Sequence, residues 1–161
     1  RGLQIDYIVQ NGKLGTYHAL ELCRNFLKDG EKFLVLYADD LHGKEGLAKC
    51  ASSEHPCLLV SEAIDPCKFG VVELNSDNSI KGIEEKPENP KSNFVSTGVL
   101  VLDKSIFNYP AVQHSNGERY LTDSIAQMIK VGYKFQAIRS NFWLPIGYPS
   151  DLVKAEKILE K

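Results

Sequence analysis

An apolar run that ends in two carboxylates is the feature that most constrains the fold of this chain. Residues 33–38 are all apolar, and Asp39 and Asp40 follow directly. A continuously apolar run of this length predicts a parallel strand that is covered on both faces. Open α/β sheets bind ligands at the carboxyl ends of their strands, where an aspartate can hold Mg²⁺. Taken alone, the pair is better explained as a turn or a helix cap.

Bulk composition fits a globular domain and argues against several classes of partner. The 161 residues predict one domain, and 43% hydrophobic and 25% charged residues are ordinary values. The net charge of −2 argues against a nucleic-acid partner, and no apolar run approaches the roughly 20 residues that span a membrane. Without a secretory signal pattern, we expect a reduced, cytoplasmic location. The cysteines, none at metal-site spacing, are Cys23, Cys50, Cys57 and Cys67.

Hydrophobic periodicity predicts an alternation of strands and helices. Leu3–Val9 is predicted as a strand, Thr16–Lys28 as a helix capped by Thr16, and the apolar run as the next strand of a right-handed parallel crossover. Further strands are predicted at 57–60, 71–74, 80–84, 99–102 and 133–138, and further helices at 46–53, 121–131 and from 149. We therefore predict one α/β domain over residues 1–161, with a mixed, mostly parallel sheet flanked by helices.

A glycine-containing segment at the start of a predicted helix is a candidate for contact with a ligand. Gln10 precedes the segment 14–20, in which Gly15 stands immediately before the predicted helix. A glycine permits close approach, and the start of a helix offers free N–H groups. The alternative is an ordinary turn between a strand and a helix. Gly98 stands immediately before a later predicted strand, at 99–102.

A predicted hairpin carries the most specific pattern in the chain. Gly70, within the segment 69–73, directly precedes its first strand at 71–74. Glu85 and Lys86 directly follow its second strand, which ends at Glu84. A carboxylate suits the vicinal hydroxyls of a sugar, and an ammonium group suits a phosphate. Standing alone, the charge run would be a solvated surface hairpin. Its pairing with the segment 69–73 favours a binding site.

The order of these segments, with Asp39–Asp40 and the segment 117–123, resembles the sugar-1-phosphate nucleotidyltransferase family. The resemblance runs from Tyr7 to Leu159. It implies a Rossmann-like nucleotidyltransferase fold. It also implies an enzyme that transfers a nucleotidyl group from a nucleoside triphosphate to a sugar 1-phosphate and releases pyrophosphate. Which base and which sugar are used stays open.

The resemblance implies roles for individual residues. Asp39 would bind Mg²⁺ and Lys86 would bind the sugar phosphate, which makes these two the candidate catalytic residues. The candidates for substrate binding are Gln10 and Gly15 at the base, and Gly70, Glu85, Gly98 and Glu118 at the sugar. Glu118 is equally well explained as an acidic residue in the first turn of a helix.

Two departures from the family pattern bear on activity. Pro145 stands where the family has a second metal-binding aspartate, and Asp151 is better explained as a helix cap. No glycine-rich G-x-G-x-R loop, which would cradle the triphosphate, occurs in the 161 residues. We therefore expect an N-terminally truncated domain that is a weak or inactive catalyst. The strand edge left unpaired would be covered in a homo-oligomer or by an altered strand order.

Two other classes of function stay open. One is a binding module that keeps affinity for a sugar or a nucleotide without catalysis. The other is a metal-dependent glycosyltransferase of similar fold, against which the hairpin pattern argues. Saturable binding without turnover would favour the first, and transfer from a nucleotide sugar would favour the second.

Overall fold

The computed structural model describes residue 2 and residues 4–160, and its sheet is built around one ten-residue strand, β6. The strands of the main sheet are β1 (Lys32–Leu36), β3 (Cys57–Glu62), β4 (Gly70–Leu74), β5 (Ile80–Glu85), β6 (Phe94–Asp103) and β7 (Gln136–Arg139). The helices are α1 (Thr16–Leu22), α2 (Lys44–Ala51), α3 (Leu121–Lys130) and α4 (Pro149–Leu159), with short 3-10 helices η1 (Arg24–Phe26), η2 (Pro66–Lys68) and η3 (Lys104–Asn108). A separate ladder joins β2 (Leu41–His42) to β8 (Trp143–Leu144).

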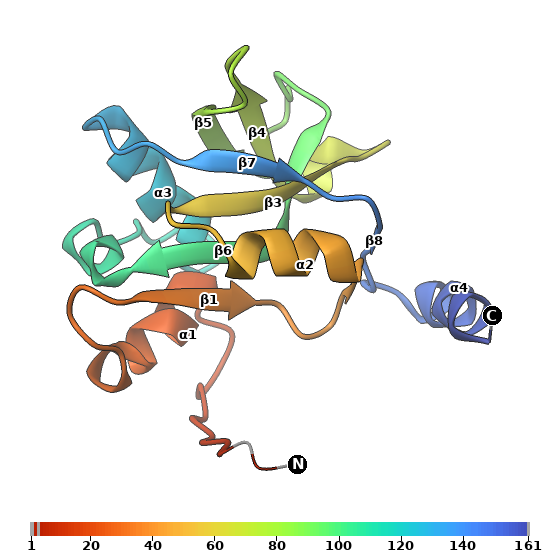
Figure 1. The fold of residues 1–161 in the computed structure, drawn as a ribbon, viewed down its shortest axis with the longest axis horizontal. Helices are drawn as coiled ribbons and strands as arrows, with labels where there is room; N and C mark the ends of the chain where they lie inside the picture. Colours follow the sequence, from red (N-terminus) through yellow and green to blue (C-terminus); the bar gives the residue numbers. More distant parts are fainter. Residues whose placement is uncertain (1, 3, 161) are drawn as a thin grey trace.

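The main sheet is mixed, as predicted, and its strand directions follow from the position of β6. β3 pairs with one edge of β6, whereas β1 and β4 share the other edge, and all three pairings are antiparallel. β7 lies parallel to β3, and β5 lies antiparallel to β4. Four strands, β1, β3, β4 and β7, therefore run one way, and β5 and β6 run the other (Figure 1). Among the described strands of this sheet, only β3 and β7 form a parallel ladder. β1 and β4 run in the same direction as β3, but β6 lies between them and β3.

Both faces of the central strands are buried, which explains their continuously apolar sequences. Because successive side chains in a strand point to opposite faces, β3 and β6 each contribute to two layers. Leu58 and Leu100 pack in the larger core on the side of α1 and α3. Cys57 and Val99 pack on the other side, beneath α2, which crosses the sheet in Figure 1. The predicted α/β architecture is confirmed.

β1 departs from its prediction as a strand covered on both faces. Phe33 and Val35 pack against the larger core, but Leu34 and Leu36 on the opposite face are 43% and 46% exposed. Among the described residues, β1 is paired only with β6, and its outer edge has no partner strand. The prediction was wrong because an apolar run shows that a strand can be buried, and does not show that the covering elements are present.

The N-terminal segment also differs from its prediction. Residues 4–10 form no strand, and Ile5, Tyr7 and Val9 are well exposed, while Leu3 lies outside the described residues. With no neighbouring strand to pair with, an alternating pattern cannot form a ladder, so the predicted crossover is absent from the described chain. Gly15, in place of Thr16, occupies the N-cap of α1, which ends at Leu22 and not at Lys28.

The last helix begins where the sequence predicts. α4 starts at Pro149, and the carboxylate of Asp151 accepts a hydrogen bond from the backbone N–H of Tyr148 at 3.1 Å. Asp151 is thus a helix cap, as expected. Figure 1 shows α4 set apart from the sheet, and Ala155 is its buried residue. Within the described part of the chain, every helix is too short or too polar to cross a membrane.

Candidate functional site

A cavity of about 270 Å³ lies where β1, β4 and β6 meet, and it gathers five of the predicted site residues. We call it the central pocket. Its lining consists of Thr16, Tyr37, Asp40, Lys68, Phe69, Gly70, Glu85, Lys86, Ser96, Thr97, Gly98, Glu118, Tyr120, Thr122 and Trp143. The predicted members are Gly70, Glu85, Lys86, Gly98 and Glu118. Gln10, Gly15 and Asp39 are outside this lining.

The β4–β5 hairpin supplies the wall that carries the charges. Gly70 pairs with Glu85 across the hairpin, so the strand start and the strand end predicted from the sequence lie side by side. The Glu85 side chain is 12% exposed and accepts a hydrogen bond from Thr122 Oγ1 at 2.8 Å. Burial raises the pKa of Glu85, and the Thr122 hydrogen bond and the charge of Lys86 oppose that rise. The pocket therefore contains a mostly buried carboxylate that can accept further hydrogen bonds from a ligand.

Lys86 stands at the end of the same strand in an unusual backbone conformation. Its φ is +42°, which residues other than glycine seldom adopt, and its N–H donates to the carbonyl of Phe69 at 3.0 Å. The Nζ lies 3.7 Å from a carboxylate oxygen of Glu85 and 5.1 Å from the ring centroid of Tyr120. A strained residue held by its surroundings is characteristic of functional sites. This turn holds a half-exposed ammonium group beside a buried carboxylate.

Gly98 serves the pocket through packing. It is buried in the middle of β6, with φ +80°, and a Cβ built there would lie 2.5 Å from the ring of Tyr37. The backbone of Gly98 accepts a hydrogen bond from Tyr37 N–H at 3.0 Å. Burial raises the pKa of Tyr37 to about 12, so its hydroxyl stays neutral. The glycine allows the aromatic ring to form the floor of the pocket.

The two aspartates after β1 have different environments. Asp40 lines the central pocket, and its two carboxylate oxygens accept hydrogen bonds from Trp143 Nε1 at 2.9 Å and Ile146 N–H at 3.1 Å. Asp39, the predicted metal ligand, is exposed. The β2–β8 ladder brings the segment with Pro145 against this loop. No group of three or more potential metal-binding side chains occurs in the part of the chain that the structure describes.

Gln10 and Gly15, predicted at the base, contact each other beside α1. Gln10 Nε2 donates to the Gly15 carbonyl at 3.0 Å and lies 3.0 Å from His18 Nδ1. Gly15 has φ +86°, and a Cβ there would collide with the backbone of Arg119. This glycine is therefore required for packing against the segment that leads into α3.

Several residues of the central pocket were given no role from the sequence. Thr122 holds the carboxylate of Glu85, Tyr120 lies under Lys86, and Trp143 holds Asp40. Trp143 is the only tryptophan in the chain, which is a signal that could have marked it. Thr122 and Tyr120 belong to the segment 117–123, in which the sequence assigns a role only to Glu118. Their contacts span long sequence separations that no local pattern reveals.

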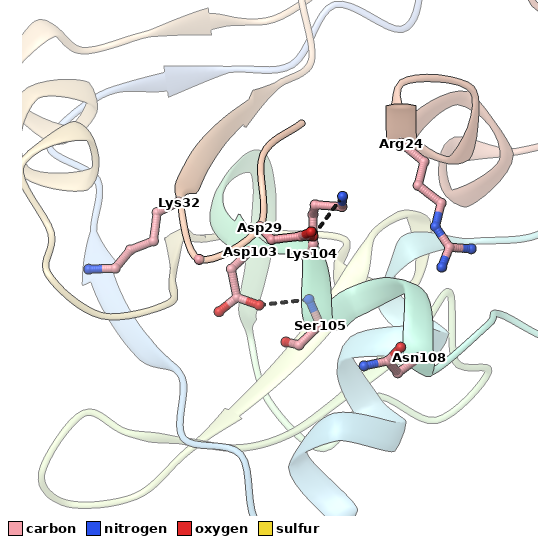
Figure 2. Close-up of a pocket in the computed structure, with 8 residues that line it drawn as sticks. Arg24, Asp29, Lys32, Asp103, Lys104, Ser105 and Asn108 are labelled. Atoms are coloured by element: carbon pink, nitrogen blue, oxygen red, sulfur yellow. Dashed lines mark hydrogen bonds and ion pairs between the residues drawn. The ribbon is translucent and has the colours of Figure 1, made fainter. Parts of the chain in front are cut away.

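A second polar cavity, of about 660 Å³, lies at the opposite end of β1 and contains none of the predicted residues. Figure 2 shows one ion pair among its charged groups, between Lys104 and Asp29, and a backbone hydrogen bond to Asp103. Lys104 Nζ lies 2.7 Å from Asp29, and Asp103 accepts a hydrogen bond from Ser105 N–H at 2.8 Å. The guanidinium group of Arg24 lies over the ring of Phe107. The central pocket is therefore the stronger candidate for function.

Comparison with known proteins agrees with the fold and identifies the family. A family model described as nucleotidyl transferase matches residues 1–161. Bifunctional protein GlmU of Methanococcus maripaludis is 34% identical over 156 residues, which cover 94% of this chain and 37% of that protein. Glucose-1-phosphate thymidylyltransferase of Streptomyces antibioticus is 31% identical over 168 residues, covering 97% of this chain and 46% of that protein. The chain thus spans less than half the length of these curated relatives.

A solved structure has a similar fold over almost all of this chain. It is assigned as a glucose-1-phosphate thymidylyltransferase from Bacillus anthracis, in complex with sucrose. The match has a TM-score of 0.80 and 25% identity, and covers 98% of this chain and 65% of that chain. With sequence, fold and family model in agreement, the chain belongs to the nucleotidyl transferase family and forms a domain of the sugar-1-phosphate nucleotidyltransferase type.

Proposed function

We propose that this domain binds a sugar 1-phosphate in the central pocket as the acceptor of a nucleotidyl group from a nucleoside triphosphate. The observation that carries the proposal is the pair Glu85 and Lys86 on one wall of the pocket, a buried carboxylate beside an ammonium group. A carboxylate accepts hydrogen bonds from sugar hydroxyls, and an ammonium group neutralises a phosphate. Two of the similar proteins, both glucose-1-phosphate thymidylyltransferases by name, support the same substrate class.

The reaction places simple demands on the protein. An oxygen of the sugar phosphate attacks the α-phosphorus of the triphosphate, the new P–O bond forms, and the bond to pyrophosphate breaks. Catalysis of such transfers comes from positioning and from neutralising charge. Lys86 would orient the attacking phosphate, and Glu85 would fix the sugar ring. Gly70, Gly98 and Glu118 would complete the sugar pocket, and Gln10 with Gly15 would face the base.

The residues after β1 fit a magnesium ion held mainly by substrate. Mg²⁺ is commonly bound through one or two carboxylates together with phosphates and water. Asp39 offers an exposed carboxylate for this purpose, whereas the carboxylate of Asp40 accepts hydrogen bonds from Trp143 and Ile146, and Pro145 has no ligating side chain. When bound, Mg²⁺ would neutralise phosphate charge and stabilise the departing pyrophosphate.

We infer that the 161 residues alone catalyse the transfer weakly or not at all. Their sequence contains no G-x-G-x-R loop to grip the triphosphate, and Pro145 replaces a metal-binding residue of the family pattern. A binding module without turnover is therefore the second candidate function. Pro145 favours it, because a proline side chain cannot ligate the metal ion that the reaction needs.

A pair of assays separates these functions. Titration with glucose 1-phosphate, followed by NMR, measures binding, and pyrophosphate release with several nucleoside triphosphates measures turnover. We expect saturable binding that Glu85→Gln and Lys86→Ala each weaken by about tenfold, as expected for loss of a charge-assisted hydrogen bond. Lys91→Ala, which removes an exposed lysine outside the pocket, is the matched control. Absence of binding to any sugar 1-phosphate would refute the proposed function, and robust turnover would refute the inferred loss of activity.

A further inference from the structure

The central pocket shares a wall with a larger groove that the sequence did not indicate. This outer groove has a volume of about 910 Å³ and lies between η2 and α4. Its lining consists of Ile64, Asp65, Cys67, Lys68, Phe69, Lys86, Leu144, Pro145, Gly147, Tyr148, Ser150, Asp151 and Lys154. Three residues, Lys68, Phe69 and Lys86, line both cavities. Two of the three are lysines, so the shared wall is cationic.

The two lysines of the shared wall are held in the same manner. Lys86 has a carboxylate, Glu85, at 3.7 Å and an aromatic ring, Tyr120, at 5.1 Å. Lys68, the last residue of η2, has Asp65 Oδ2 at 3.1 Å and the ring centroid of Tyr148 at 6.0 Å. The hydrogen bond from Lys68 to Asp65 raises the pKa of Lys68, so its amine stays charged. Both side chains remain about half exposed and can exchange a carboxylate partner for a ligand.

The size of the central pocket indicates where a charged substituent must lie. Sites that enclose a whole small molecule usually measure about 300–1,000 Å³. At about 270 Å³, the central pocket is below that range and suits one sugar ring, in keeping with the single buried carboxylate on its wall. A phosphate attached to the ring would then lie at the opening toward the outer groove. Lys68 and Lys86 are the cations at that opening.

We propose that Lys68 is a second phosphate-binding residue of this site, and that it acts with Lys86 on the phosphate of a bound sugar 1-phosphate. This assignment rests on the proposed function. The phosphate displaces Asp65 as the partner of the Lys68 ammonium group, and no covalent step is involved. Lys154 lines only the outer groove, where it is paired with Asp151 at 2.8 Å, so Lys68 and Lys86 are the lysines that line both cavities.

The test compares a phosphorylated sugar with a neutral one. The 161-residue chain is titrated with glucose 1-phosphate and with methyl α-glucoside, and dissociation constants are obtained from NMR shifts. Lys68→Ala is expected to weaken the binding of glucose 1-phosphate about tenfold and to leave the affinity for methyl α-glucoside unchanged. Lys68→Arg, which keeps the charge, is expected to retain most of the affinity. Lys91→Ala serves as the control for loss of a surface lysine.

Each outcome separates this assignment from the function on which it rests. If Lys86→Ala loses affinity and Lys68→Ala behaves like Lys91→Ala, the role of Lys68 is overturned and the proposed function stands. If Lys68→Ala weakens the binding of both sugars equally, the proposed contact between Lys68 and the phosphate is overturned. If the unsubstituted chain binds no glucose 1-phosphate, the titration is repeated with other sugar 1-phosphates, and both proposals fail together if none binds. Thermal melting of each variant checks folding, and Lys68→Ala is expected to melt at the same temperature as the unsubstituted chain because the Lys68 side chain is exposed.

Discussion

The two sides of the central pocket differ in how completely they are built. On the hairpin side, β4 and β5 pair with each other, Glu85 is held by Thr122, and Lys86 is fixed by a strained turn. On the β1 side, the strand has one partner, Leu34 and Leu36 are exposed, and Asp39 projects into solvent. Side chains converge where both neighbouring elements are present in the described chain, and they stay apart where one is absent. The hairpin side therefore defines the binding site.

The largest expected effect comes from filling the space at Gly98, where the two sides meet. Gly98→Val combines a left-handed backbone with a clash against Tyr37, and we expect a loss of about 2–5 kcal/mol in the free energy of unfolding. Gly132→Ala is the matched control, since Gly132 has φ +98° and open space around it, and it should lose about 1–2 kcal/mol. Urea denaturation measures both. Equal losses at the two sites would show that the Tyr37 contact is unimportant.

The two aspartates after β1 are expected to contribute differently to stability. Asp40→Asn leaves one of two N–H donors, from Trp143 and Ile146, without an oxygen, and should cost about 1–3 kcal/mol of stability. Asp39→Asn should change stability by less than about 0.5 kcal/mol, because that side chain is exposed. Denaturation of both variants provides the comparison. A larger loss for Asp39→Asn would reverse the assignment of the two residues.

Glu85→Gln should separate stability from binding on the hairpin side. Burial raises the pKa of Glu85, so folding favours its protonated form and this contribution is lost as pH rises above the ordinary range of a glutamate. Relative to the unsubstituted chain, Glu85→Gln should therefore gain stability as pH rises from 4 to 7. At the same time, its affinity for glucose 1-phosphate should fall about tenfold. If the difference in stability between Glu85→Gln and the unsubstituted chain is the same at every pH, burial of this carboxylate has no energetic consequence.

The smallest effect on folding is expected at the open face of β1. Leu36→Lys places a charge on a side chain that is already 46% exposed, and it should change stability by less than about 0.5 kcal/mol. If the unpaired edge of β1 drives association into a homo-oligomer, the same substitution should reduce it, since lysine discourages edge pairing. Sedimentation velocity over a range of concentrations measures this. A chain that is monomeric at every concentration would show that the unpaired edge of β1 does not drive association.

The accuracy of sequence reasoning followed the same division between the two sides. The hairpin pattern around Gly70 and Glu85 was locally complete, so its strands and their pairing were predicted correctly. The strand at 3–9 and the burial of Leu34 were predicted wrongly, because both depend on neighbours that a local pattern cannot supply. The contact between Thr122 and Glu85 and that between Trp143 and Asp40 join residues far apart in sequence, and only the fold reveals them.

The most direct measurement is the location of the NMR shifts that glucose 1-phosphate induces in the chain. The proposed function predicts that the largest shifts fall on the backbone amides of Gly70, Glu85 and Lys86, with smaller changes at Gly98. Shifts confined to the polar cavity around Lys104, or no shifts at saturating ligand, would contradict a sugar-phosphate site on the β4–β5 hairpin.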